Sequence, residues 1–286
     1  MFTFSPIMKP GILKKGLITS LILGFASTVS AQKVNELQEV SIIAPHSLKI
    51  DGKNFEWAPN DFSSNKRTSI SYLISNDDKN LYLVVKSTDV MNNNKILAGG
   101  ITFSVNPDGK KKEKESLTLT YPNIVRQARG GQGGGRGQMR IGMSGFGGGS
   151  QSTKQRDSAM SAMQKSQLAT AKEIKISGFK KTTDTLVSIY NQSGIKAFAS
   201  IDTANVYFYE AAIPLEELGL LIESPKEFAY NIKLNGLQIP GFDGFGGGGG
   251  GGGGRGGFGG GGRGGVDFQA LISPTDFWGK YILTKK

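Results

Sequence analysis

Short runs of apolar residues alternate with polar stretches along most of this sequence, which is the pattern of β-strands separated by turns. Residues 70–74 and 81–85 are β-branched and aromatic runs joined by a polar turn, and they predict an antiparallel hairpin. A second hairpin is predicted from residues 101–105 and 116–121, because Asn-Pro-Asp-Gly at 106–109 has the usual chemistry of a tight turn.

The second half of the chain repeats this pattern around one helical segment. Met160, Met163 and Leu168 recur at roughly helical spacing and Asp157 can cap the start, so residues 157–172 predict one short helix. Further strands are predicted at residues 173–176, 185–190, 195–201, 206–213, 228–234 and 281–283. The expected fold class is all-β, an antiparallel β-sandwich with one short inserted helix.

The stretch at residues 48–57 opens this domain. Ile50 is followed by Asp51 and Gly52, the pair that most readily supplies the positive φ angles of a tight turn. Trp57 comes shortly after and must find cover. A strand is expected to end at Ile50, to turn, and to place Trp57 on the core.

The strand predicted at residues 206–213 carries Glu210 and ends at Pro214. A single acidic turn closed by Leu218 and Gly219 follows the proline. Proline prevents further ladder pairing while it suits the first turn of a helix. This segment therefore predicts a strand that stops at Pro214 and passes into a short helical turn.

These two segments resemble motifs of the domains related to carbohydrate-binding module family 9, in family order. Residues 81–89 resemble the family's second hairpin strand, and residues 275–283 resemble its closing strand, so the matches span residues 50–283. The resemblance implies a β-sandwich of the bacterial envelope type, here with glycine-rich insertions. It also implies a framework role for four residues, namely Asp51, Gly52, Glu210 and Pro214.

In sugar-binding members, the resemblance implies aromatic rings that clamp a terminal sugar, since a CH-rich sugar face stacks on an apolar ring. Trp57 and Trp278 are the two tryptophans of the chain and hence the candidate carbohydrate-binding residues, with Trp278 expected in a turn at the sandwich end. Both lie in framework segments, so core packing is the competing interpretation. Residues 97–101 lack the acidic residue that such modules bring near the binding face.

The N-terminus has the layout of a secretory signal peptide. Three lysines precede an apolar run at residues 16–29 that is too short to span a bilayer, and Ala31 closes an acceptable cleavage site. Cleavage is expected between Ala31 and Gln32, with a buried N-terminal helix as the alternative. The predicted organisation is a signal peptide at 1–31, a leading arm at 32–47 and the sandwich at 48–286, exported to the periplasm, cell surface or medium.

Composition limits the chemistry. The chain has no cysteine, and His46 is its one histidine, which argues against disulfides, a zinc site and a well-placed Ser-His-Asp triad. The acidic turn at residues 75–80 lacks the alternating oxygen ligands of a calcium loop. Glycoside hydrolysis needs a pair of carboxylates, which Glu210 could form with Asp89 or Glu56. The distance between the two carboxylates would decide the mechanism, and the sequence does not give it. No enzyme activity, metal or cofactor is expected.

Two glycine-rich tracts, at residues 129–150 and 241–265, interrupt the pattern and are expected to be disordered insertions, because so many glycines cannot repay their ordering entropy. The net charge is +11. Weak, salt-sensitive contacts with anionic surfaces are expected from the arginines of these tracts; plain flexible loops or single-stranded nucleic acid binding are the alternatives. These arginines are Arg129, Arg136, Arg140, Arg255 and Arg263.

The sequence thus predicts an exported, non-catalytic sandwich of roughly nine to eleven strands that binds glycan or the cell surface. Its expected partners are polysaccharide or other envelope components, without specific nucleic acid and without a membrane-spanning segment in the mature chain. The alternative is a structural or interaction protein that kept the scaffold and lost the sugar site. A row of exposed aromatics on one face would favour glycan binding, and an aromatic-free face would favour the alternative.

Overall fold

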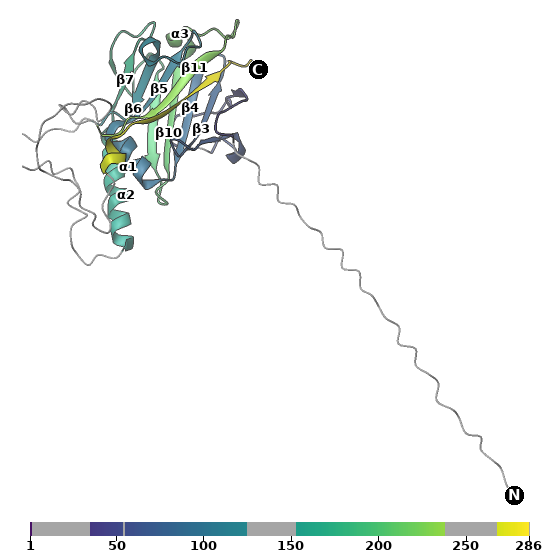
Figure 1. Ribbon diagram of the computed structural model, residues 1–286, viewed down its shortest axis with the longest axis vertical. Helices are drawn as coiled ribbons and strands as arrows, with labels where there is room; N and C mark the ends of the chain where they lie inside the picture. The colour runs from purple at the N-terminus through teal and green to yellow at the C-terminus, as the bar shows by residue number, and fades with distance from the viewer. Residues whose placement is uncertain (2–34, 54, 125–152, 238–267, 286) are drawn as a thin grey trace, which may run out of the picture. The chain divides into compact units, whose positions relative to one another are not determined.

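The computed structural model describes residues 1, 35–53, 55–124, 153–237 and 268–285 (Figure 1). Both glycine-rich tracts, their five arginines, the predicted signal peptide after Met1 and its cleavage site lie outside these residues. The described chain from residue 35 onward forms two six-stranded sheets, so the prediction of an all-β sandwich is confirmed. No described helix is both long enough and apolar enough to cross a bilayer.

Sheet A has the order β1-β3-β4-β10-β9, with β2 paired to β3, and all its pairs are antiparallel except β1 with β3. Its strands are β1 (Ile42–Ile43), β2 (Ser63–Asn65), β3 (Ile70–Asn76), β4 (Asn80–Ser87), β9 (Lys196–Ile201) and β10 (Tyr207–Pro214). Strands β3 and β4 form the first predicted hairpin. Their partner β10 comes from far along the sequence.

Sheet B is antiparallel throughout, in the order β12-β11-β5-β6-β7-β8. Its strands are β5 (Ile101–Asn106), β6 (Leu117–Tyr121), β7 (Glu173–Ser177), β8 (Leu186–Ser188), β11 (Phe228–Leu234) and β12 (Thr275–Tyr281). The second predicted hairpin, β5 and β6, lies beside β11. The described sheets hold twelve strands, one more than the upper expectation, because two- and three-residue strands such as β1 and β2 also pair.

The helices are α1 (Val90–Gly99), α2 (Thr153–Thr170), α3 (Leu215–Leu218) and α4 (Phe268–Ile272), with 3-10 turns η1 (Pro59–Asp61) and η2 (Glu113–Glu115). Helices α1, α2 and α4 gather at the end of the sandwich opposite α3 (Figure 1). α3 is the acidic turn predicted after Pro214. α2 begins at Thr153, so the prediction that Asp157 caps it is wrong.

The sequence analysis missed α1. Residues 90–99 contain three asparagines and a glycine, all poor helix formers, so no helix was predicted there. The structure supplies an N-cap, because Asp89 Oδ1 accepts a hydrogen bond of 2.7 Å from the Asn92 backbone N–H. Ile96 and Leu97 then bury one face of the helix in the core.

The inner faces of the sheets form one core that includes five fully buried tyrosines. These are Tyr72, Tyr121, Tyr207, Tyr209 and Tyr230. The hydroxyls of Tyr72 in sheet A and Tyr230 in sheet B lie 2.9 Å apart and link the two layers. Strand alternation therefore places the aromatic residues inward, as expected for a sandwich.

A smaller cluster lies on the outer face of sheet A. Trp57 packs there with Leu73, Tyr82 and Val84, beneath chain segments that precede β3. Residues 48–50 run over this face without forming a strand, so the strand predicted to end at Ile50 is absent. Sheet A is consequently covered on both faces, whereas sheet B is covered mainly on its inner face.

Candidate functional site

The two candidate tryptophans lie on opposite outer faces of the sandwich. Trp57 belongs to the cluster on sheet A and is 7% exposed. Trp278 is half-buried in the middle of β12. Phe277 and Gly279 on either side of it face the core, so the Trp278 side chain faces outward. The turn expected around Trp278 is therefore a strand, and the sandwich keeps the two rings from clamping one sugar between them.

Trp278 stands on a face of sheet B that we call the polar face. Strand pairing aligns its side chains in two neighbouring rows. The first row is Trp278, Asn231, Ser104 and Thr118; the second is Asp276, Lys233, Thr102 and Thr120. Neighbouring strands are about 4.8 Å apart, so each row presents hydrogen-bonding groups at a fixed, short spacing.

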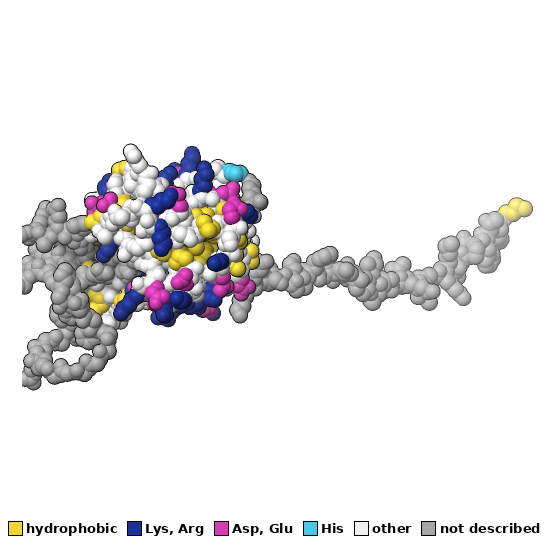
Figure 2. Space-filling view, turned by 90° about the horizontal axis from the view of Figure 1, so that it is seen from above, with side chains coloured by type: hydrophobic (Ala, Val, Ile, Leu, Met, Phe, Trp, Pro, Cys, Tyr) yellow, Lys and Arg dark blue, Asp and Glu magenta, His cyan; other side chains and the backbone are white. Residues whose placement is uncertain are grey.

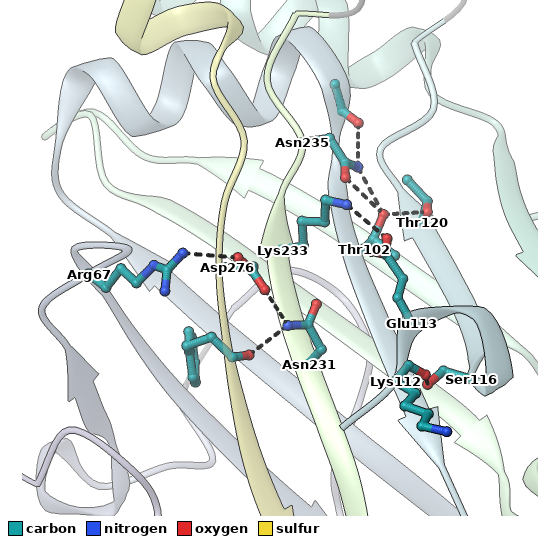
Figure 3. Close-up of polar contacts among 12 residues, drawn as sticks. Arg67, Thr102, Lys112, Glu113, Ser116, Thr120, Asn231, Lys233, Asn235 and Asp276 are labelled. Atoms are coloured by element: carbon teal, nitrogen blue, oxygen red, sulfur yellow. Dashed lines mark hydrogen bonds and ion pairs between the residues drawn. The ribbon is translucent and has the colours of Figure 1, made fainter. Parts of the chain in front are cut away.

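Hydrogen bonds hold the Asp276 end of this face in place (Figure 3). Asn231 Nδ2 donates to Asp276 Oδ2 at 2.8 Å and to the Phe277 carbonyl at 2.9 Å. Arg67 reaches the other carboxylate oxygen, with Nη2 3.5 Å from Asp276 Oδ1. The carboxylate and amide are thus positioned before any ligand arrives.

The Thr102 end is also fixed (Figure 3). The Oγ1 atoms of Thr102 and Thr120 lie 2.7 Å apart, and Asn235 Nδ2 donates to Thr102 Oγ1 at 2.9 Å. Lys233 extends between the two ends and pairs with Glu113, Nζ to Oε1 2.8 Å. This pair is exposed on the Glu113 side, so a competing ligand can displace it at little cost.

The floor of the polar face is buried although it faces outward. Asn231 and Ser104 are almost fully covered by their neighbours, and Ser104 Oγ has no hydrogen-bond partner among the described residues. Sequence reasoning named Trp278 but missed the polar residues of this face. The signal was present, because polar residues fall at every second position of β5 and at residues 231 and 233 of β11.

Glu210 occupies the outer face of sheet A beneath the Asp51–Gly52 turn. Its Oε2 accepts hydrogen bonds from the backbone N–H groups of Asp51 at 2.9 Å and Gly52 at 2.8 Å. Gly52 has φ +76°, and a Cβ there would lie 2.7 Å from the Phe198 ring. Ser200 Oγ also donates to the Gly52 carbonyl at 2.6 Å. The carboxylate therefore binds the Asp51–Gly52 turn to sheet A.

Burial raises the pKa of Glu210 to about 7, and the charges of Glu56 and Asp51 add to this shift, while the two backbone hydrogen bonds oppose it. Glu210 Oε1 has no partner in the described chain. Asp89 is engaged as the cap of α1. The turn at residues 51–52 lies over Glu210, whose side chain is almost fully buried. Pro214 ends β10, paired with Asn80.

A hollow of about 270 Å³ borders Trp57 on sheet A. Phe62 and Lys86 also line it, and Lys86 Nζ lies 5.7 Å from the centroid of the Phe208 ring. Trp57 forms a wall here rather than a stacking platform, because so little of its ring is exposed.

On the face seen in Figure 2, acidic and basic side chains are intermixed among the described residues.

Comparisons with known proteins give one likeness of fold. No family model matches the sequence, and no curated protein matches it. A solved structure of a carbohydrate binding module family 9 (CBM9) from Caldicellulosiruptor kristjanssonii in complex with glucose is similar, with a TM-score of 0.31 and 10% identity over 70% of this chain and 80% of that chain. That structure belongs to the family whose motifs this sequence resembles.

Proposed function

We propose that this chain is an exported, non-catalytic carbohydrate-binding module and that it contacts glycan on the polar face of sheet B. The observation that carries this proposal is the half-buried Trp278 beside the Asn231 amide, which a hydrogen bond holds against the Asp276 carboxylate. An indole ring offers an apolar surface to the CH face of a sugar. The neighbouring carboxylate, amide and ammonium groups suit the hydroxyls around the ring edge.

The rigidity of the face supports this function. Its side chains stand on strands and are already hydrogen-bonded to one another, as Asn231 is to Asp276. Little side-chain freedom is therefore lost when a ligand binds. The partly exposed members of this face, such as Asp276, Thr102 and Thr120, are held in place at strand spacing and can offer fixed hydrogen-bonding groups to a polyol.

Titration of the full chain with cello-, xylo- and other soluble oligosaccharides tests this proposal by tryptophan fluorescence. Trp278→Ala should abolish binding and leave the fold intact, because the ring lies outside the core. Trp57→Ala is the matched control: it should keep binding but destabilise the protein by about 3–5 kcal/mol, as for a large buried aromatic. No sugar response, with equal destabilisation by both substitutions, would contradict the proposal.

Export is part of the same proposal and rests on the signal-peptide layout of residues 1–31. The exported protein should begin at Gln32, because Ala31 closes the one acceptable cleavage site behind the apolar run. Intact-mass analysis of the secreted or periplasmic fraction measures this directly. A protein that retains the apolar segment would be evidence against secretion.

The second candidate is a structural or interaction protein that kept the scaffold without a sugar site. It is favoured by the lack of a row of exposed aromatics in the part of the chain that the structure describes, where Phe55 and Tyr190 are exposed on separate segments. In that case the arginine tracts would supply weak contacts with anionic surfaces. Binding to such surfaces should then fall steeply with salt, whereas glycan binding at Trp278 should not.

A further inference from the structure

A groove of about 390 Å³ lies between α2 and strand β9, away from the polar face. Residues from α2 and the segment just after it, from β9, from the end of β6 and from the turn after β8 line it. They are Tyr121, Lys165, Leu168, Ala169, Ala171, Lys172, Ile189, Phe198, Ala199, Ser200 and Ile201. We call this the α2–β9 groove.

The groove exists because β9 is an edge strand. β9 pairs with β10 on one side only, and four consecutive residues, 198–201, line the groove. Since successive side chains of a strand point to opposite faces, the groove follows the unpaired side of β9. Leu168 and Ala171 anchor α2 in the core, and Tyr121 donates a hydrogen bond of 3.2 Å to the Ala171 carbonyl.

The helix stands too close to β9 for a peptide to enter as an added strand. Cα atoms of α2 and β9 approach within 8 Å, whereas an added strand would itself need about 4.8 Å beside β9 and a full packing layer beyond it. The available space suits a small molecule. Its volume lies at the low end of the ~300–1,000 Å³ range of small-molecule sites.

The chemistry of the lining is apolar with a positive rim. Lys165 lies on α2 and Lys172 lies just after the end of that helix. Both are exposed, and neither ammonium group forms an ion pair or hydrogen bond with another described residue. None of the described lining residues is acidic. Between the lysines, Leu168 and Ala169 offer an apolar wall. The groove therefore combines an apolar trough with an unneutralised positive charge at its mouth.

We propose that the α2–β9 groove binds a soluble amphipathic carboxylate of the medium-chain fatty-acid type. The alkyl chain lies along Leu168, Ala169 and Ile201, and the carboxylate meets Lys165 or Lys172. Apolar burial supplies the affinity, and the lysines set the orientation and the preference for an anion. This inference is independent of glycan binding on the polar face.

Calorimetric titration of the full chain with octanoate, decanoate and dodecanoate tests the proposal. Each added methylene should tighten binding about fourfold until the groove is full. Dodecyltrimethylammonium, which has the same tail and a positive head, should bind at least about tenfold more weakly than dodecanoate. Equal binding of the two amphiphiles, or no dependence on chain length, would overturn the proposal.

Variants locate the site. Ala169→Trp fills the groove from an exposed helix position and should abolish dodecanoate binding. Lys165→Glu combined with Lys172→Glu should weaken it about tenfold, since each exposed pair contributes little by itself. Lys111→Glu combined with Lys114→Glu, an equal change of charge on an exposed loop, is the control and should bind as the parent does. Undiminished binding by Ala169→Trp would place the ligand elsewhere and overturn the proposal.

Anionic vesicles test whether the groove takes a soluble amphiphile or contacts a membrane surface. The proposal expects free dodecanoate to bind and phosphatidylglycerol vesicles to leave the protein in the supernatant on sedimentation. The contrary result is that the protein sediments with the vesicles, that Lys165→Glu with Lys172→Glu prevents this, and that dodecanoate does not bind. The groove would then contact a membrane surface, and the proposal of a soluble ligand would be wrong.

Discussion

At the scale of single residues, Glu210 shows how one buried carboxyl organises a surface. It anchors the Asp51–Gly52 turn through two backbone hydrogen bonds, yet its second oxygen has no partner in the described chain. Burial disfavours its charged form, which is why its pKa rises to about 7. The protein therefore carries, beneath its Asp51–Gly52 turn, a carboxyl group that titrates near neutral pH.

The sign of the resulting pH dependence follows from linkage. The folded protein holds a proton on Glu210 up to about pH 7, whereas the unfolded chain loses it near its ordinary pKa of 4.5. The contribution of this group is largest at low pH and is lost as the pH rises through about 7. Over that window the free energy of unfolding should fall by up to about 3 kcal/mol.

Glu210→Gln isolates this effect. Gln can still accept the hydrogen bonds from Asp51 and Gly52, but it does not titrate. Denaturant unfolding between about pH 5 and pH 8 should show the parent losing stability relative to the variant as the pH rises. Parallel curves for the two proteins would mean that Glu210 is ionised throughout this range.

At the scale of elements, β12 requires a glycine in its middle. A Cβ on Gly279 would overlap Cζ and Oη of Tyr230, whose ring is fully buried on the neighbouring strand β11. Tyr230 in turn reaches Tyr72 across the core. Gly279 therefore makes room for the ring that links the two sheets, and this explains the glycine beside Trp278.

Gly279→Ala should destabilise the protein by about 1–3 kcal/mol, because the Tyr230 ring must shift in a packed core. Thermal or denaturant unfolding measures the loss. In a Tyr230→Ala background the same substitution should be much better tolerated, and the double-mutant cycle should show a strong coupling between the two positions. Additive losses would indicate that Gly279 is needed for another reason.

At the scale of the whole molecule, the two outer faces of the sandwich differ. Sheet A is covered by the segments around Trp57, and sheet B presents its polar face. Stability resides in the core between the sheets and in the Trp57 cluster.

Replacing both tracts with short Gly-Ser linkers should leave the thermal midpoint nearly unchanged. Loop closure depends only weakly on length, by about 0.6 kcal/mol per doubling, and the tracts offer few apolar side chains for packing. Thermal unfolding of the single and double replacements checks this. A clear drop in the midpoint for either replacement would show that the tract packs onto the sandwich.

Local patterns in the sequence determined the elements of this protein. β-branched and aromatic runs in β3 and β4, joined by a polar turn, predicted the first hairpin, and the Asn-Pro-Asp-Gly turn between β5 and β6 predicted the second. Pro214 marked the end of β10, since it cannot continue a strand ladder. These signals lie within a few residues of one another, and no distant contact is needed to interpret them.

Only the tertiary structure decided what distant segments do together. The pairing of β4 with β10 and of β5 with β11 joins residues 120 or more positions apart, and no local pattern encodes those neighbours. That pairing assembled the polar face, separated Trp57 from Trp278 and buried Glu210. It also stabilised α1 through packing despite its asparagines, because burial of an apolar face outweighs weak helix propensity. The chain thus encodes its strands locally, while its candidate sites arise from long-range pairing.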